Sequence, residues 1–211
     1  MTSPDHETGT DRVAEAAALP EAARSDVVVN IQGDQPLLDP DALDGLVAAF
    51  DVGPPGAPDM ATLFEPLRSI EDLIDPNVAK VIADGGGNAI YFSRAPIPFY
   101  RQPGAGMRRE FETLIASRRG GLQGYWKHVG VYAFRRDFLF EFGRLPRGPL
   151  EASEGLEQLR ALESGRRIRL VPSAGVSISV ETPEDLERVE AIMSPGGRED
   201  AGRGRDGTDE A

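Results

Sequence analysis

The chain has 211 residues, 40% of them hydrophobic, and a formal net charge of -12. That length suits one domain, with or without a tail. The acidic balance argues against nucleic acid and anionic membranes as partners. Cysteine is absent, which excludes disulfides and Cys-type zinc sites, and with only His6 and His128 a multi-histidine metal site is disfavoured. A bound metal would therefore sit on carboxylates, which favours magnesium.

Targeting signals are not evident in the sequence. No apolar run reaches the roughly 18 residues of a membrane span. The N-terminal segment MTSPDHETGTDR lacks the basic-then-apolar form of a signal peptide. We therefore expect a cytoplasmic protein.

The first third of the chain alternates predicted helices and strands. Thr10 is a candidate N-cap for a helix over 11–19. Residues 26–31 are apolar and β-branched between polar flanks, which is typical of a strand buried on both faces and hence parallel to its neighbours. A helix over 39–50 has proline near its first turn, and a short strand over 60–63 follows.

The middle of the chain predicts a hairpin. Segments 77–83 and 89–93 are strand-like and flank DGGGN, a glycine-rich turn. Residues 102–124 are rich in glycine and arginine and indicate a loop with a short helix. A strand over 125–134 and a helix over 136–142 come next.

The C-terminal part predicts two helices around two strands. Leucines at helical spacing indicate a helix over 151–164, and 167–171 and 176–180 are strand-like. Thr182 is a strong N-cap, because proline follows it at N1 and an aspartate stands at N3.

Strands that alternate with helices indicate an α/β fold with a mainly parallel sheet, to which the hairpin adds an antiparallel appendage. Residues 194–211 contain no apolar residue larger than alanine. We therefore expect a disordered tail after a domain that covers residues 1–193.

Asp34 stands just after the strand predicted over 26–31, in the sequence QGDQP. A Gly-Asp-x-Pro segment ends a strand well, so Asp34 could simply belong to a turn. The carboxyl ends of strands are also where α/β sheets bind ligands, and a carboxylate there can hold a metal. From the residues alone, both interpretations stay open.

Four stretches match one family in order and spacing: HETGTDRVAE, NIQGDQP, DPNVAKVIADGGGNAIYFSRAPIPFYR, and the discontinuous KHVGVYAFRRDFL…LEASEGLEQLRALESGRRI…SVETPEDLERV. Through them the chain resembles the 3-deoxy-manno-octulosonate cytidylyltransferase (CMP-Kdo synthetase) family. The resemblance implies a Rossmann-like nucleotide-diphospho-sugar transferase fold that forms a homodimer. It also implies a reaction in which the anomeric hydroxyl of the sugar acid Kdo attacks the α-phosphorus of CTP. The products are CMP-Kdo, which feeds lipopolysaccharide biosynthesis, and pyrophosphate. Magnesium is implied too, and it suits a reaction that joins two anions.

The resemblance also implies the site residues. Asp34 falls on one catalytic, metal-binding carboxylate, and Glu181 falls on the other, where the family usually has aspartate. The Kdo pocket falls on Gln32, Arg101, His128, Tyr132, Glu157 and Gln158. The nucleotide site falls on Thr8, Gly9 and Arg12. A guanidinium suits the Kdo carboxylate, and amide and imidazole groups suit its hydroxyls. Without the resemblance these would be ordinary loop, core and helix-surface residues.

The N-terminal signature of the family, a loop resembling R-x-x-S-x-R-L-P-G-K, has no counterpart in this sequence. That loop cradles the CTP phosphates with backbone N–H groups and cations. We therefore expect a chain truncated at its N-terminus, with an exposed sheet edge and weakened chemistry. A misplaced start is the simplest explanation.

Three other functions are considered. A related cytidylyltransferase could act on sialic acid or on 8-amino-Kdo, and side chains do not separate Kdo from its 8-amino analogue, which differs in one exocyclic group. A truncated remnant could act as a non-catalytic binding module. A nicotinamide-binding Rossmann protein is rejected, because no helix follows the glycines of DGGGN.

Overall fold

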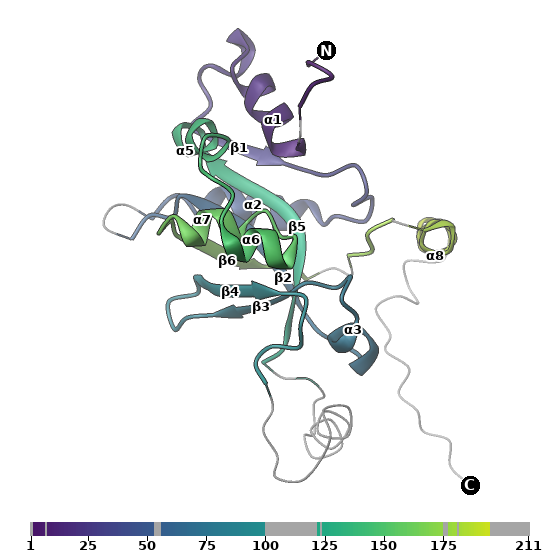
Figure 1. Cartoon of the computed structure of the whole chain (residues 1–211). Helices are drawn as coiled ribbons and strands as arrows, with labels where there is room; N and C mark the ends of the chain where they lie inside the picture. The colour runs from purple at the N-terminus through teal and green to yellow at the C-terminus, as the bar shows by residue number, and fades with distance from the viewer. Residues whose placement is uncertain are drawn as a thin grey trace, which may run out of the picture.

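The computed structural model describes residues 2–6, 8–52, 56–99, 122, 124–174, 177–180 and 182–194. Within these ranges, no helix is long and apolar enough to cross a membrane. One central sheet carries helices on both faces, as Figure 1 shows. The strands are β1 (Val27–Asn30), β2 (Met60–Pro66), β3 (Lys80–Ala83), β4 (Ala89–Ser93), β5 (Trp126–Arg135) and β6 (Ile168–Pro172). The helices are α1 (Gly9–Ala17), α2 (Pro40–Ala48), α3 (Ile70–Ile74), α5 (Arg136–Phe142), α6 (Pro149–Glu154), α7 (Leu159–Glu163) and α8 (Pro183–Met193), with a 3-10 turn at Pro20–Ala22.

The sheet is organised around β5. Its strand order is β4-β3-β5-β2-β6, and β1 also pairs with β5. The strand β5 runs antiparallel to β1, β2 and β3, and only β2 and β6 pair in parallel among the described strands. The α/β class is confirmed, but the prediction of a mainly parallel sheet is wrong. An apolar run indicates that a strand is buried, but it does not indicate the direction of the strand. That direction depends on the connections to neighbouring strands, which lie outside the run.

Both β1 and β3 lie along the same side of β5, at opposite ends of it. The strand β3 pairs with Trp126 and Lys127, whereas β1 pairs with residues 132–135. On the other side, β2 pairs with β5 through a break in register between Thr62 and Leu63. Among the described strands, none therefore pairs continuously with this side of β5 between β1 and β3.

Side-chain caps mark the start of four of the seven described α-helices, α1, α2, α3 and α8. Helix α2 begins at its Asp39 cap, and α8 begins with a capping box between Thr182 and Asp185, as predicted. Helix α1 begins earlier than predicted. Thr8, rather than Thr10, is its N-cap, because Asp11 stands at the N3 position of Thr8 and completes a capping box.

Two other predicted elements differ from the structure. The helix expected over 151–164 is divided into α6 and α7, because Gly155 adopts a left-handed conformation (φ 61°, ψ 37°) that ends α6. Residues 177–180 form no strand, although the pattern predicted one over 176–180. The predicted hairpin around DGGGN is confirmed as β3 and β4, which pair in antiparallel fashion.

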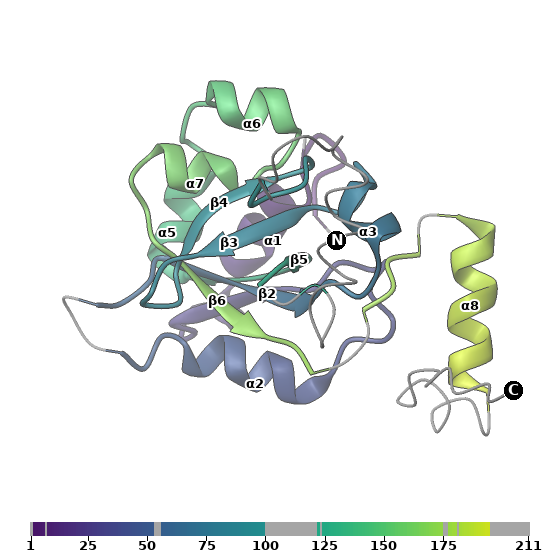
Figure 2. The same cartoon turned by 90° about the horizontal axis from the view of Figure 1, so that it is seen from below.

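Apolar side chains fill both faces of the sheet. One cluster joins α1, α5 and α7 to the strands and includes Phe134, Phe138 and Leu159. A second lies under α2 and includes Leu46 and Val131. A third, smaller cluster packs Leu73 of α3 against Leu67 and Tyr125. Figure 2 shows α2 on one face, α5, α6 and α7 on the other, and α8 standing apart from the sheet. Close packing on both faces holds the sheet rigid. Polar side chains that project from the strands therefore keep fixed positions.

Candidate active site

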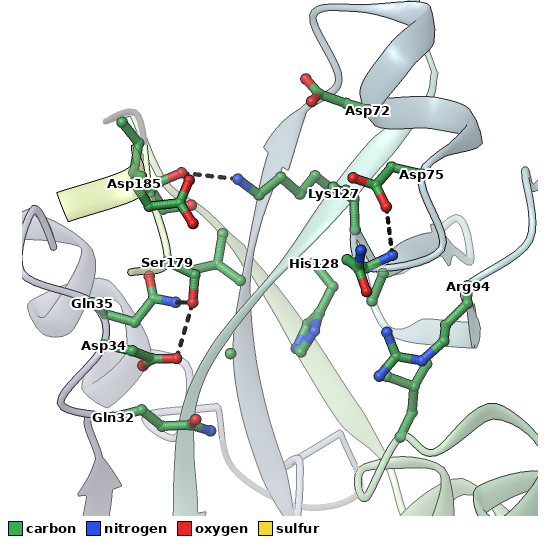
Figure 3. A pocket seen from close by; sticks show the side chains of 18 of the residues that line it. Gln32, Asp34, Gln35, Asp72, Asp75, Arg94, Lys127, His128, Ser179 and Asp185 are labelled. Carbon is green, nitrogen blue, oxygen red and sulfur yellow. Dashed lines mark hydrogen bonds between the residues drawn. The ribbon is translucent and has the colours of Figure 1, made fainter. Parts of the chain in front are cut away.

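A cavity of about 660 Å³ lies at the gap between β1 and β3. Segments that are distant in sequence form its wall: the loop after β1, helix α3 and the loop that follows it, Arg94 after β4, the first half of β5, the turn between α6 and α7, residues 177–179, and the start of α8. Figure 3 shows their side chains around the opening. Six of the predicted site residues line it: Gln32, Asp34, His128, Tyr132, Glu157 and Gln158.

Asp34 is held by the segment that follows β6. Its Oδ2 accepts a hydrogen bond from Ser179 Oγ at 2.9 Å, and its backbone carbonyl accepts from the N–H of Val180 at 2.9 Å. Gln35 Nε2 donates to the same Ser179 hydroxyl at 3.1 Å (Figure 3). The second carboxylate oxygen, Oδ1, is buried without a hydrogen-bond partner. Asp34 therefore has a fixed orientation and one oxygen available for a ligand.

The available oxygen fits a hard cation such as Mg²⁺, which prefers carboxylate ligands and binds proteins through one or two of them. No group of three or more His, Asp or Glu side chains in the described ranges could hold a metal by itself. Glu181, the second predicted carboxylate, lies outside the described residues. A metal at Asp34 would thus find one protein ligand among the described residues and would need others.

His128 is buried beneath the cavity. Its Nε2 lies 2.9 Å from the hydroxyl of Thr62, and its ring contacts Phe92 edge-on with centroids 5.0 Å apart. Burial lowers the pKa of His128 to about 3. The imidazole is therefore neutral at physiological pH.

Tyr132, Glu157 and Gln158 form a polar wall next to His128. The hydroxyl of Tyr132 donates to Gln158 Oε1 at 3.1 Å, and burial raises the pKa of this phenol. Glu157 Oε2 accepts from Thr10 Oγ1 at 2.9 Å, and burial raises the pKa of this carboxyl. Two buried atoms of this wall, Gln158 Nε2 and Glu157 Oε1, lack partners. A donor and an acceptor are therefore left for a polar ligand.

The cationic side chains of the wall are largely engaged already. Arg94 donates to the backbone carbonyls of Glu154 and Pro76 at 2.7 and 2.8 Å, so it ties the α6 terminus to the loop before β3. Lys127 donates to the carbonyl of Ser177 at 2.8 Å. Acidic residues outnumber basic ones in the described wall, by five to three. An anionic ligand here would thus need further positive charge, such as a metal.

Comparison with known proteins identifies the family. The sequence profile described as Cytidylyltransferase matches residues 1–168. The chain belongs to the cytidylyltransferase family.

Its curated relatives carry a more specific name. The chain is 48% identical over 189 residues to a 3-deoxy-manno-octulosonate cytidylyltransferase of Geobacter sulfurreducens, covering 90% of this chain and 71% of the relative. It is also 48% identical over 193 residues to the protein of that name from Solibacter usitatus, covering 92% and 68%. A solved CMP:2-keto-3-deoxy-manno-octonic acid synthetase complexed with CTP aligns with a TM-score of 0.74 and 34% identity, covering 92% of this chain and 70% of that one. The predicted family and its fold are confirmed.

The nucleotide residues that the cytidylyltransferase resemblance implied are not part of the cavity wall. Thr8 caps α1, and the guanidinium of Arg12 donates to Thr2 Oγ1 at 2.8 Å and to the carbonyl of Ser3 at 3.2 Å. Gly9 is the first residue of α1. Arg101 lies outside the described residues. The roles of these four residues stay predictions.

Lys127 and Ser179 line this cytidylyltransferase cavity, and Thr62 contacts His128 beneath it, yet none of the three was singled out from the sequence. Lys127 directly precedes His128 in the KHVGVY segment, so that motif could have indicated Lys127 as a site residue. Thr62 and Ser179 gave no signal, because single hydroxyl residues in apolar segments are common. Their importance follows only from what they contact.

Proposed function

We propose that the chain activates Kdo with CTP and releases CMP-Kdo and pyrophosphate. The single observation that carries this proposal is the meeting of QGD, KHVGVY and LEQ residues around one cavity. These segments span residues 32 to 158, and the relatives named above act, by their name, on the same sugar acid. The cavity size also falls in the range of small-molecule sites.

The reaction forms one bond and breaks another. The anomeric hydroxyl oxygen of Kdo bonds to the α-phosphorus of CTP while the bond from that phosphorus to the pyrophosphate oxygen breaks, and the hydroxyl proton passes to solvent. Asp34 Oδ1 would hold Mg²⁺, which neutralises charge that develops on the phosphate oxygens. Glu157 Oε1 and Gln158 Nε2 bind sugar hydroxyls, since they are an unpaired acceptor and an unpaired donor. In this proposal Arg101 binds the Kdo carboxylate and Glu181 completes the metal site.

Pyrophosphate release from CTP, Kdo and Mg²⁺ tests the proposal, with Asp34→Asn beside the wild type. The matched control is Asp44→Asn, which changes an exposed aspartate of α2. We expect Asp34→Asn to lower turnover at least about 100-fold, because an amide is a poor metal ligand, and Asp44→Asn to leave it unchanged. A wild-type chain that releases no pyrophosphate would refute the assignment and favour a binding module.

The same assay decides between sugar acids. Kdo, 8-amino-Kdo and sialic acid are offered separately, and the proposal requires the highest kcat/KM for Kdo.

We further propose that the enzyme works as a homodimer in the cytoplasm, with residues 194–211 as a tail outside its domain. Sedimentation of the full chain, and of one ending at residue 193, would test the dimer and the tail.

A further inference from the structure

The register break between β2 and β5 brings unpaired backbone carbonyls and a threonine hydroxyl together inside the sheet. Thr62 pairs with Tyr132 and the next residue, Leu63, pairs with Val129, so Gly130 and Val131 have no partner on β2. Such bulges free backbone groups from the ladder and often occur beside active sites. The fully buried hydroxyl of Thr62 points at this bulge.

Three polar atoms surround that hydroxyl. The carbonyl of Val131 lies 2.9 Å from Thr62 Oγ1 and the carbonyl of Val129 lies 3.2 Å from it. The third is His128 Nε2, at 2.9 Å. A threonine hydroxyl has one proton to donate and two lone pairs, whereas a carbonyl can only accept.

Counting protons decides the direction of each bond. The single hydroxyl proton must go to the carbonyls, because otherwise lone pairs of Thr62 Oγ1 and Val131 O would face each other at 2.9 Å without a hydrogen between them. The contact with His128 can then be satisfied only if Nε2 carries a proton and donates it to Thr62. In a neutral imidazole, the other nitrogen, Nδ1, is consequently an acceptor.

We propose that Thr62 is a positioning residue that holds His128 in the Nε2–H tautomer, so that Nδ1 accepts a hydrogen bond from a hydroxyl of the sugar acid. The inference rests on the proposed function for the identity of the ligand, but not for the tautomer. In this tautomer, His128 recognises a hydroxyl group of the ligand by accepting its hydrogen bond. An unprotonated Nδ1 cannot donate to a carboxylate or a phosphate, so those anions must be bound by other residues.

Packing around the ring supports the same role. The ring centroid of Phe92 lies 5.0 Å from that of the imidazole, with an interplanar angle of 78°. The ring centroid of Tyr132, on the same strand as His128, lies 5.5 Å from that of the imidazole. These rings hold the plane of the imidazole, while Thr62 fixes which nitrogen carries the proton. The low pKa of His128 agrees with a ring that stays neutral in the cavity.

Nitrogen-15 NMR of the full chain measures the tautomer directly. The chain has two histidines, so His6→Gln leaves the signals of His128 alone. We expect Nε2 to show the shift of a protonated nitrogen and Nδ1 that of an unprotonated one, from pH 6 to 8. An Nδ1–H signal or an imidazolium pattern would overturn the tautomer, whatever reaction the chain catalyses.

Addition of Kdo to the same sample tests the acceptor role. The Nδ1 signal should move toward the protonated range as Kdo saturates, while Nε2 stays nearly constant. A Kdo-saturated sample with an unmoved Nδ1 signal would refute the contact to the sugar acid. Failure of pyrophosphate release would instead refute the proposed function and leave the tautomer measurement valid.

Kinetics test whether Thr62 acts through His128. Thr62→Val removes the hydroxyl at similar volume, and we expect a five- to tenfold higher KM for Kdo, with little change in the KM for CTP. Thr62→Ser keeps the hydroxyl and should restore most of the Kdo affinity. In a His128→Phe background, Thr62→Val should have almost no further effect on kcat/KM, because the two residues act as one unit. Additive effects, or equal losses for both substrates, would show a merely structural role.

Discussion

Ser179→Ala is the most informative single substitution, because the Ser179 hydroxyl orients Asp34, the proposed metal ligand. Its hydroxyl donates to Asp34 Oδ2 at 2.9 Å and accepts from Gln35 Nε2 at 3.1 Å. Asp34 Oδ1 already lacks a partner, so the variant leaves both carboxylate oxygens without a side-chain donor. Asp34 would then rotate more freely and present Oδ1 to a metal less often.

The magnitude follows from the type of bond that is lost. A hydrogen bond to a charged group contributes about 1.5–3 kcal/mol, and the lower value applies because Asp34 is only partly buried. About 1.4 kcal/mol corresponds to a factor of ten, so we expect the Mg²⁺ concentration for half-maximal activity to rise roughly tenfold. At saturating Mg²⁺, kcat should return close to the wild-type value.

The assay is pyrophosphate release at a series of Mg²⁺ concentrations. Ser194→Ala is the matched control, since it removes the same hydroxyl from an exposed position at the end of α8. An unchanged Mg²⁺ dependence in Ser179→Ala would refute the argument that this hydroxyl orients Asp34. A loss of kcat that Mg²⁺ does not restore would refute it too, because it would indicate damage to the fold.

Three further predictions concern the framework of the site. The guanidinium of Arg160 donates two hydrogen bonds, at 2.7 and 2.8 Å, to the buried carboxylate of Glu151. Arg160→Met should therefore lower the free energy of unfolding by about 3 kcal/mol in urea titrations, and adding Glu151→Gln to the same chain should recover part of this loss. Gly155→Ala should cost about 1 kcal/mol in the same assay, because its left-handed backbone suits glycine although no atom lies within 4 Å of the added Cβ; wild-type stability would contradict this. Burial lowers the pKa of Lys80 from 10.5 to about 8, so the folded state binds fewer protons than the unfolded state between these pH values. The free energy of unfolding of the wild type, measured relative to Lys80→Met, should therefore rise as pH rises from 8 to 10 and fall again as pH returns to 8. A difference between the two proteins that stays constant over this range would contradict the lowered pKa of Lys80.

Local signals in the sequence predicted the elements well. The caps of α2 and α8 and the glycine turn between β3 and β4 depend on residues within a few positions of one another, and all three are confirmed. The errors are also local in origin. A leucine pattern outweighed Gly155, and Thr10, which looked like a cap, lies in the first turn of α1, two residues after the actual cap. In each case a competing signal within the same few residues decided the outcome.

The sequence by itself determined the family, most of the helix and strand boundaries to within a few residues, and six side chains of the cavity wall. These depend on short motifs and on local backbone chemistry. Only the tertiary structure decided that β5 runs against three of its neighbours, and that its bulge turns two carbonyls toward Thr62. Strand direction, and the hydrogen-bond partners of a buried hydroxyl, are set by segments far away in the chain. No local pattern carries that information, because the energy of such contacts exists only once the sheet has formed.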